Sequence, residues 1–189
     1  MSLPNFLIIG ATKAGTTSLH HYLNQHPEIF MCKRKETNYF AQESALCLLG
    51  DTIKNQEEYE RLFSEAGDAK AIGETSPAYL CVPWAPERIA HVLPHVKLIA
   101  ILRDPADRAY SHYLMRRRQG KEFRDSFEQC IQEADIDPER SYKHRGLYGE
   151  QLERYFAHFQ KDQCKIFLYE DFRSEEHTSE LQSPDHLVC

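Results

Sequence analysis

The sequence predicts one α/β domain in which helices flank a central parallel sheet. Three uninterrupted apolar runs, at residues 6–9, 96–102 and 164–169, are typical of strands buried on both faces. Stretches of helical length lie between these runs, and strands that alternate with helices form parallel crossover units. A chain of 189 residues is long enough to build one hydrophobic core of this kind.

The helices are expected, in chain order, at residues 17–25, 56–66, 86–93, 105–119, 123–134 and 147–159. The fourth has the clearest start, because Pro105 suits the first helical position and follows Asp104. The last carries its apolar residues on one stripe. Ligands of parallel sheets bind at the carboxyl ends of the strands, so the residues that follow each strand are the candidates for a site.

Composition narrows the possible functions. The net charge of −6 argues against a general binder of nucleic acid or of anionic membranes, and no run approaches the ~18 apolar residues of a membrane span. The six cysteines form no CxxC pair and the histidines show no zinc spacing, so we expect reduced thiols and no metal. A strand begins almost at the N-terminus, which leaves no room for a signal peptide. These observations predict a cytoplasmic protein.

The stretch GATKAGTTSL follows the first predicted strand and leads into a helix. Backbone N–H groups at such a helix start bind anions. Gly15 lets the backbone approach an anion closely, and Thr16, Thr17 and Ser18 add hydroxyl donors. A Walker A loop has lysine directly after this glycine, but Thr16 stands there and the lysine is Lys13, within the loop. With no Walker B run beside it, the loop predicts a P-loop NTPase-like three-layer fold that binds a compact 5′-substituent instead of a triphosphate.

The stretch LIAILRDPADRAYSHY ends a predicted strand and opens a predicted helix. Arg103, at the strand end, supplies a fixed fork of donors for a phosphate, and Ser111 lies about two turns into the helix. Each residue also has an ordinary alternative. Arg103 can form an ion pair with Asp104 or Asp107, and Ser111 can be a solvated hydroxyl.

Together the two stretches resemble the signature motifs of sulfotransferases that use 3′-phosphoadenosine 5′-phosphosulfate, especially the carbohydrate (heparan-sulfate-like) branch and its bacterial relatives. The resemblance extends from about residue 4 to residue 172. It implies that the 5′-phosphosulfate is held by Lys13, Ala14, Gly15, Thr16, Thr17 and Ser18, and the 3′-phosphate by Arg103 and Ser111. It also implies a metal-independent enzyme that sulfates a hydroxyl or amine of an acceptor, expected to be a carbohydrate.

The resemblance also suggests which groups perform the chemistry. Sulfuryl transfer needs a cation on the departing phosphate oxygen and a base for the acceptor proton. We expect Lys13 to supply the first and Glu36 the second, because a glutamate before an aromatic pair occupies this place in the carbohydrate branch. Some relatives carry a histidine two residues later, where this chain has Asn38. The alternative for Glu36 is a surface carboxylate paired with Lys33 or Lys35.

Four residues are expected on the acceptor side: Lys35, Asn38, Glu74 and Tyr148. Lys35 flanks the expected base. Glu74 belongs to the stretch GETSPAYL, which resembles a family segment lining the acceptor cleft, so it is expected to contact the acceptor or Lys13. A carboxylate at a helix start is the alternative for Glu74, and core packing is the alternative for Tyr148. The acceptor itself is expected to be a saccharide or another small molecule, and the oligomeric state is not encoded in any recognisable pattern.

The last residues differ from the rest of the chain. Residues 173–189 show no apolar periodicity, and residues 173–183 look like the in-frame translation of a sequencing adapter. We therefore expect a sulfotransferase domain over residues 1–172 that lacks its C-terminal part, followed by an artefactual, disordered tail. Two rival functions stay open: a non-catalytic nucleotide-binding fragment, and a P-loop kinase that would need ATP and magnesium.

Overall fold

The structure, a computed structural model, describes residues 3–44, 53, 55–132 and 141–175. Its centre is a five-stranded sheet with the strand order β2-β3-β1-β4-β5, in which every pairing is parallel. The strands are β1 (Phe6–Gly10), β2 (Ile29–Met31), β3 (Ala71–Thr75), β4 (Lys97–Leu102) and β5 (Cys164–Leu168). The three strands predicted from apolar runs are β1, β4 and β5, and the predicted α/β class is confirmed.

Strands β2 and β3 were not predicted, for different reasons. Strand β2 has only three residues, too few to show a pattern. Strand β3 reads AIGET, and its central glycine lowers strand propensity. Gly73 is nevertheless required there, because a Cβ atom would lie 2.2 Å from the Phe6 ring and 2.7 Å from the Met31 sulfur. The side chains of the neighbouring strands therefore fill the space over Gly73.

A helix lies within or across each of the six predicted segments. The observed bounds are α1 (Thr16–Leu23), α2 (Gln56–Arg61), α3 (Ala85–Val92), α4 (Pro105–Arg118), α5 (Phe127–Gln132) and α6 (Tyr148–Phe156). Asp104 caps α4, since its side chain accepts hydrogen bonds from the N–H groups of Ala106 and Asp107. The prediction was least accurate for α2, which ends five residues before the expected bound. Residues 133 and 134 of the fifth predicted segment lie outside the described residues.

A further helix, α7 (Tyr169–Glu175), was not predicted. It crosses the boundary expected between the domain and its tail at residues 172 and 173. Phe172 on this helix is 5% exposed and belongs to the main hydrophobic cluster. Residues 176–189 of the expected tail lie outside the described residues.

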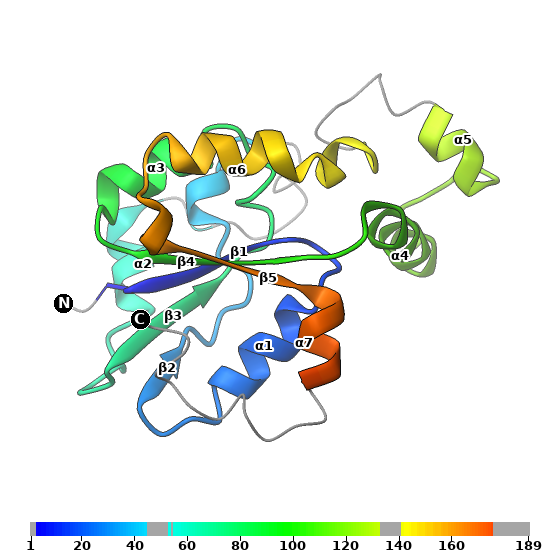
Figure 1. Cartoon of the computed structure of the whole chain (residues 1–189). Coiled ribbons are helices and arrows are strands. Elements are labelled where there is room, and N and C mark those ends of the chain that lie inside the picture. The colour runs from blue at the N-terminus through cyan, green and yellow to red at the C-terminus, as the bar shows by residue number, and fades with distance from the viewer. Residues whose placement is uncertain (1–2, 45–52, 54, 133–140, 176–189) are drawn as a thin grey trace.

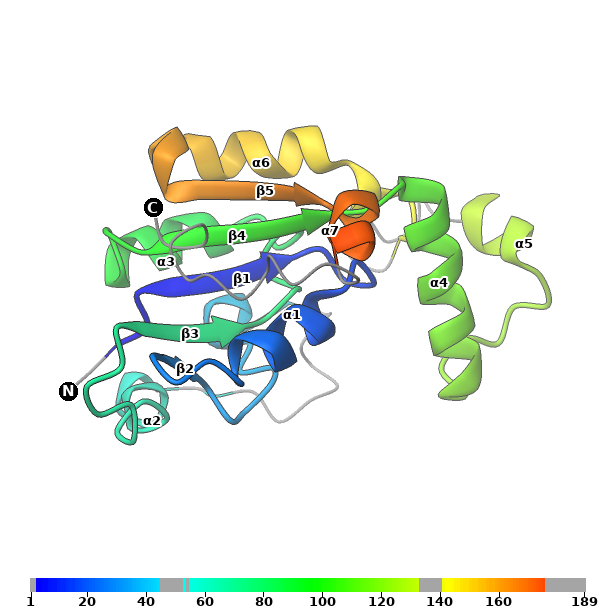
Figure 2. The same ribbon diagram turned by 60° about the horizontal axis from the view of Figure 1, so that its bottom comes forward.

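The elements form three layers (Figure 1). Helices α3 and α6 cover one face of the sheet, and α1 and α7 lie on the other (Figures 1 and 2). Helices α4 and α5 extend beyond the carboxyl ends of the strands (Figure 2). They share a small hydrophobic cluster of their own, built from Ala109, Tyr113, Cys130 and Tyr142. This arrangement places the start of α4 beside the loop that follows β1.

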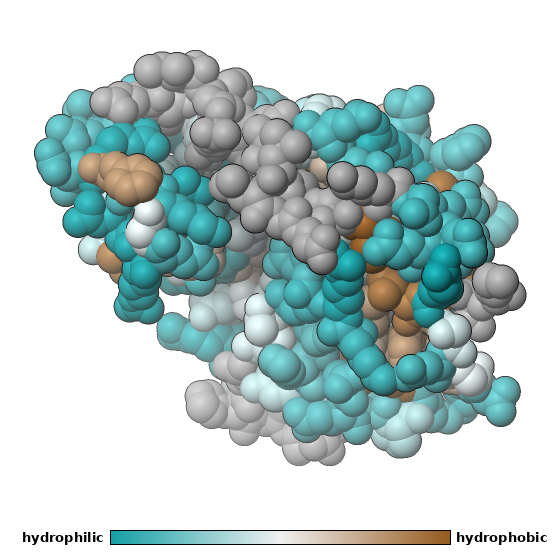
Figure 3. Space-filling view, turned by 180° about the vertical axis from the view of Figure 1, so that it is seen from behind, coloured by the Kyte–Doolittle hydropathy of each residue, from teal (hydrophilic) through white to brown (hydrophobic). Residues whose placement is uncertain are grey.

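The outer surface of the rear face is mainly hydrophilic, with its hydrophobic residues confined to limited areas (Figure 3). No helix in the described residues combines the length and the apolar character needed to cross a membrane.

Candidate active site

A cleft of about 610 Å³ lies at the carboxyl ends of the central strands. Thr12 follows β1, Pro77 follows β3 and Arg103 follows β4, and all three line it. Strand β1 lies between β3 and β4, so the chain leaves it at the point where a parallel sheet binds ligands. The predicted site residues that line the cleft are Lys13, Gly15, Thr16, Thr17, Lys35, Glu36, Asn38, Arg103 and Ser111.

The loop between β1 and α1 has the backbone that the sequence predicted for anion binding. Lys13 has φ 73° and Gly15 has φ 86°, both in the left-handed region. Gly15 is the N-cap of α1, and no side chain caps this helix start. No capping side chain therefore accepts a hydrogen bond from the N–H groups in the first turn of α1. Such N–H groups at a helix start are suited to bind an anion. Two predicted loop residues do not line the cleft: Ala14 is fully buried beneath the loop, and Ser18 is half-buried on α1.

Helix α7 covers the outside of this loop. A Cβ atom added at Gly15 would lie 3.2 Å from the Tyr169 ring and 3.3 Å from the Phe172 ring. The residue must therefore be glycine for two reasons, its positive φ and the close approach of the two aromatic rings.

Arg103 joins the second motif to the loop. One of its terminal nitrogens, Nη1, donates a hydrogen bond to the backbone carbonyl of Lys13 at 3.4 Å. The guanidinium lies over the Tyr169 ring, 4.8 Å from its centroid, and Nη2 lies 3.7 Å from an Asp107 carboxylate oxygen. The predicted alternative ion pair is therefore present, but Nε is buried with no hydrogen-bond partner. The orientation of Arg103 is therefore fixed by three contacts, to the Lys13 carbonyl, the Tyr169 ring and the Asp107 carboxylate.

Tyr148 contacts the backbone of Arg103. Its hydroxyl donates a hydrogen bond to the Arg103 carbonyl oxygen at 3.1 Å, and burial raises its pKa. Tyr148 does not line the cleft. The structure thus places this predicted acceptor residue as a support of the strand end that carries Arg103.

The cleft is strongly cationic although the chain is acidic overall. Its lining contains six lysines and arginines, Lys13, Lys35, Arg103, Arg116, Lys121 and Arg145, against one carboxylate, Glu36. Burial lowers the pKa of Lys13, and repulsion from Arg103 and Arg118 lowers it further. Cations that destabilise one another in this way are stabilised by a bound anion. The electrostatics therefore favour a ligand with several negative charges.

The expected base, Glu36, lines the same cleft. Glu36 has a side chain that is 37% exposed, and its Oε1 lies 3.4 Å from Nζ of Lys35. The predicted alternative, a pair with Lys35, is thus observed, while Lys33 pairs with Glu65 instead. Asn38 has φ 52°, and its side-chain oxygen is buried without a hydrogen-bond partner.

Glu74 is not where the sequence analysis expected it. Its side chain is fully buried and contacts neither Lys13 nor the cleft. The hydroxyl groups of Thr37, Tyr59, Ser76 and Tyr79 donate hydrogen bonds to its carboxylate instead. The expectation of an acceptor contact was wrong, because the strand continues to Thr75 and Glu74 points into the core from it.

Several cleft residues were not predicted. His112, Met115, Arg116 and Gln119 line the cleft together with Ser111. They recur at helical spacing along α4, so the period of 3.6 residues from Ser111 could have identified them. Burial lowers the pKa of His112 to about 2, with Arg145, Arg108 and other cations adding to the effect. No local signal identified Arg145, Lys121 or Tyr169, which reach the cleft from other segments.

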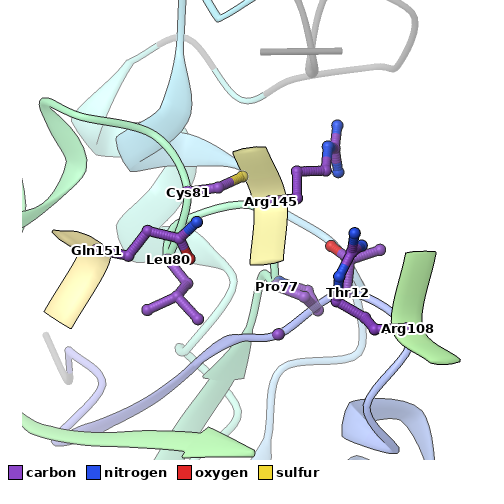
Figure 4. A pocket seen from close by; sticks show the side chains of 8 residues that line it. Thr12, Pro77, Leu80, Cys81, Arg108, Arg145 and Gln151 are labelled. Carbon is purple, nitrogen blue, oxygen red and sulfur yellow. The ribbon is translucent and has the colours of Figure 1, made fainter. Parts of the chain in front are cut away.

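A small recess of about 10 Å³ lies behind the loop, between α4 and α6 (Figure 4). Arg108 and Gln151 line it from opposite sides, and Thr12 and Arg145 belong to both the recess and the cleft. Arg108 is fully buried and donates a hydrogen bond from Nη2 to the carbonyl oxygen of Tyr142. Arg108, the second arginine of the stretch RDPADRAYS, therefore anchors α4 to the Tyr142 carbonyl and does not line the cleft.

The described residues contain no cluster of histidine, cysteine and carboxylate side chains that could hold a metal ion. Cys32, Cys81, Cys130 and Cys164 are free thiols.

A parallel sheet with a glycine-containing loop between its central strand and the following helix is the P-loop NTPase-like arrangement. The cleft beside this loop is cationic and includes Arg103, which follows the neighbouring strand β4. Such a cleft favours a ligand that carries several negative charges.

The chain belongs to the sulfotransferase family, whose domain model matches residues 3–182. The membrane-associated sulfotransferase kil1 of Dictyostelium discoideum is 34% identical over 72% of this chain and 29% of its own length. The bifunctional heparan sulfate N-deacetylase/N-sulfotransferase 2 of Bos taurus is 30% identical over 91% of this chain and 20% of its own length. The chain thus spans less than a third of each of these relatives. The crystal structure of a sulfotransferase from Alicyclobacillus acidocaldarius has a TM-score of 0.84 and 33% identity, over 93% of this chain and 77% of that one.

Proposed function

We propose that the protein transfers a sulfuryl group from 3′-phosphoadenosine 5′-phosphosulfate to a hydroxyl or amine of a carbohydrate acceptor. The observation that supports this most strongly is the junction of the two motifs. Lys13, Arg103 and Ser111 line one cleft, and Arg103 is hydrogen-bonded to the loop at Lys13. One nucleotide with an anionic group at each end of its ribose would engage both motifs at once.

The donor site is proposed as follows. The N–H groups and hydroxyls of residues 13–18 would hold the 5′-phosphosulfate, with Thr16 and Thr17 facing the cleft. Arg103 and Ser111 would hold the 3′-phosphate. Burial and the charge of Arg103 lower the pKa of Lys13. The negative charges of the bound donor would offset this repulsion among the cations of the cleft.

The chemical step would use one group on each wall. Glu36 would accept the proton of the acceptor hydroxyl or amine as its oxygen or nitrogen attacks sulfur. The bond between sulfur and the 5′-phosphate oxygen would break, and the Lys13 ammonium would stabilise the charge that develops on that oxygen. The products would be the sulfated acceptor and 3′-phosphoadenosine 5′-phosphate. This step needs no metal.

The acceptor side would be formed by Lys35, Glu36 and Asn38, which share the cleft with the loop. A saccharide acceptor is supported by the relatives whose names specify heparan sulfate sulfotransferases. The cytoplasmic location expected from the sequence stays a prediction, which fractionation of cells that express the protein would test.

The function is tested by transfer of labelled sulfate from the donor to an unsulfated heparan-type oligosaccharide in the presence of a chelator. We expect transfer by the full chain, and a decrease in kcat of at least about 100-fold in Glu36→Gln, since general-base catalysis contributes about that much. Transfer of phosphate from ATP with magnesium would identify the rival kinase. Donor binding without transfer to any saccharide would favour the non-catalytic fragment.

A further inference from the structure

Glu74 is a buried carboxylate held by hydroxyl groups alone. Its Oε1 accepts hydrogen bonds from Ser76 at 2.7 Å, from Tyr79 at 2.8 Å and from Thr37, and its Oε2 accepts one from Tyr59 at 2.6 Å. Among the described residues no cation forms an ion pair with it. Burial raises its pKa, and the four hydroxyl bonds oppose that effect. Such a costly group calls for a structural reason.

Three of the four hydroxyls have a second partner on the chain segment that carries the expected base. The Ser76 oxygen accepts a hydrogen bond from the Asn38 N–H group at 3.1 Å. The Thr37 oxygen accepts one from Tyr39 at 3.3 Å, and the Tyr79 oxygen accepts one from Phe40 at 3.4 Å. Three successive backbone N–H groups, at residues 38, 39 and 40, are therefore bound by hydroxyls that all face Glu74.

The direction of these hydrogen bonds depends on the carboxylate. A hydroxyl has one proton, and a carboxylate can only accept, so each of these three hydroxyls directs its proton to Glu74 and a lone pair to a backbone N–H group. An amide in place of the carboxylate carries no charge and has one acceptor oxygen with two lone pairs for the three hydroxyls that share Oε1, so at least one of them would lose its acceptor. That hydroxyl could then turn, and its hydrogen bond to the backbone of residues 38–40 would no longer be fixed.

The segment held in this way is the acceptor wall of the cleft. Glu36 directly precedes Thr37, and Asn38 and Glu36 both line the cleft. Asn38 is also in the left-handed conformation, which is uncommon for a non-glycine residue although asparagine adopts it more readily than most.

We propose that Glu74 is a positioning residue that orients three hydroxyls so that they fix the turn at residues 36–40 and thereby aim Glu36 and Asn38 into the cleft. The catalytic consequence rests on the proposed function, whereas the structural part does not.

The structural part is tested by amide hydrogen exchange in the full chain. In Glu74→Gln we expect exchange at Asn38, Tyr39 and Phe40 to accelerate by about tenfold or more, with Leu98 and Ile99 of β4 unchanged. Tyr79→Phe and Tyr59→Phe form a matched pair, because each removes one hydroxyl from Glu74 but only the Tyr79 hydroxyl accepts from a backbone N–H group. Tyr79→Phe should accelerate exchange at Phe40, and Tyr59→Phe should leave residues 38–40 protected.

The catalytic part is tested with the unsulfated heparan-type oligosaccharide. We expect Glu74→Gln to lower kcat by at least about tenfold while its affinity for 3′-phosphoadenosine 5′-phosphate stays within about twofold of the wild type. In a Glu36→Gln background the same change should have little further effect, because both act through one group.

Each outcome decides between the alternatives. Unchanged exchange at residues 38–40 in both Glu74→Gln and Tyr79→Phe would overturn the proposal, as would equal acceleration by the two tyrosine variants. Full kcat in Glu74→Gln, with exchange accelerated, would remove the catalytic part. Should Glu74→Gln fail to fold, the tyrosine pair still gives the answer. A wild-type chain that binds no bisphosphate and transfers no sulfate would contradict the proposed function and leave the exchange result to decide the structural part.

Discussion

Two buried histidines predict that the protein loses stability in mild acid. His20 is 7% exposed, and its Nδ1 lies 3.0 Å from the Thr75 hydroxyl. Burial lowers its pKa to about 4, with Lys35 and His21 adding to the effect. His112 is 5% exposed, and burial together with Arg145 and other cations lowers its pKa to about 2. Both imidazoles are therefore neutral in the folded protein at pH values where an unfolded chain protonates them.

The magnitude follows from proton linkage. An unfolded histidine has a pKa near 6.5, so between pH 8 and pH 5 each of these residues binds a proton in the unfolded chain but not in the folded one. Stability therefore falls as the pH drops through 6.5, by about 2 kcal/mol per histidine at pH 5, or about 4 kcal/mol for both. Glu74 has a raised pKa and acts in the opposite direction, but its contribution cancels when variants are compared with the wild type.

The assay is urea unfolding at pH 8 and pH 5 for the wild type and for His20→Gln, His112→Gln and His158→Gln. Each buried variant should reduce the pH dependence of the unfolding free energy by about 2 kcal/mol. His158 is exposed beyond the end of α6, so its replacement should leave the dependence unchanged. A pH dependence in His20→Gln and His112→Gln equal to that of the wild type would refute the reasoning.

Three further predictions concern the loop, its cover and the segment between α4 and α5. Gly15→Ala should destabilise the fold by about 1–2 kcal/mol, measured by thermal unfolding, because alanine is strained at φ 86° and its Cβ would meet Tyr169. Tyr169→Leu should weaken bisphosphate binding by about two- to fivefold in calorimetry, since it removes the ring under the Arg103 guanidinium. Burial would raise the pKa of Glu122, but hydrogen bonds from Arg124 and Tyr142 outweigh it and lower the pKa to about 2. Its stabilisation is therefore present above about pH 4.5 and lost toward pH 2, and Glu122→Gln should abolish this part of the acid unfolding curve.

Local sequence patterns predicted the elements and residues whose position depends only on their neighbours in the chain. Apolar runs identified β1 and β4 because strands buried on both faces need continuous apolar residues. The run at β5 also marked a strand, but the expectation of burial on both faces was wrong there, because β5 lies at the edge of the sheet and leaves Ile166 38% and Leu168 53% exposed. The Lys13 loop and Arg103 were placed correctly in one cleft because both directly follow parallel strands, whose carboxyl ends share one edge.

The sequence was insufficient where a role depends on contacts between distant segments. Glu74 was misassigned because two of its four hydroxyl partners, Tyr59 and Thr37, lie 15 and 37 residues away, and no local pattern shows that these segments close over it. Tyr169 was taken as the end of a strand, but it begins a helix that returns over Gly15. Such close approaches are set by tertiary packing, which local patterns do not contain.

The central claim is that the Lys13 loop and Arg103 form one site for a nucleotide with anionic groups at both ends. Calorimetric titration of 3′-phosphoadenosine 5′-phosphate into the full chain tests it most directly. We predict micromolar binding (Kd about 1–10 μM, or roughly −7 to −8 kcal/mol), weakened at least about tenfold in Lys13→Ala and in Arg103→Ala. Lys161→Ala, at an exposed position away from the cleft, should bind like the wild type. A folded protein that binds ATP with magnesium in preference to the bisphosphate, or that binds the bisphosphate equally well without Lys13 and Arg103, would contradict the claim.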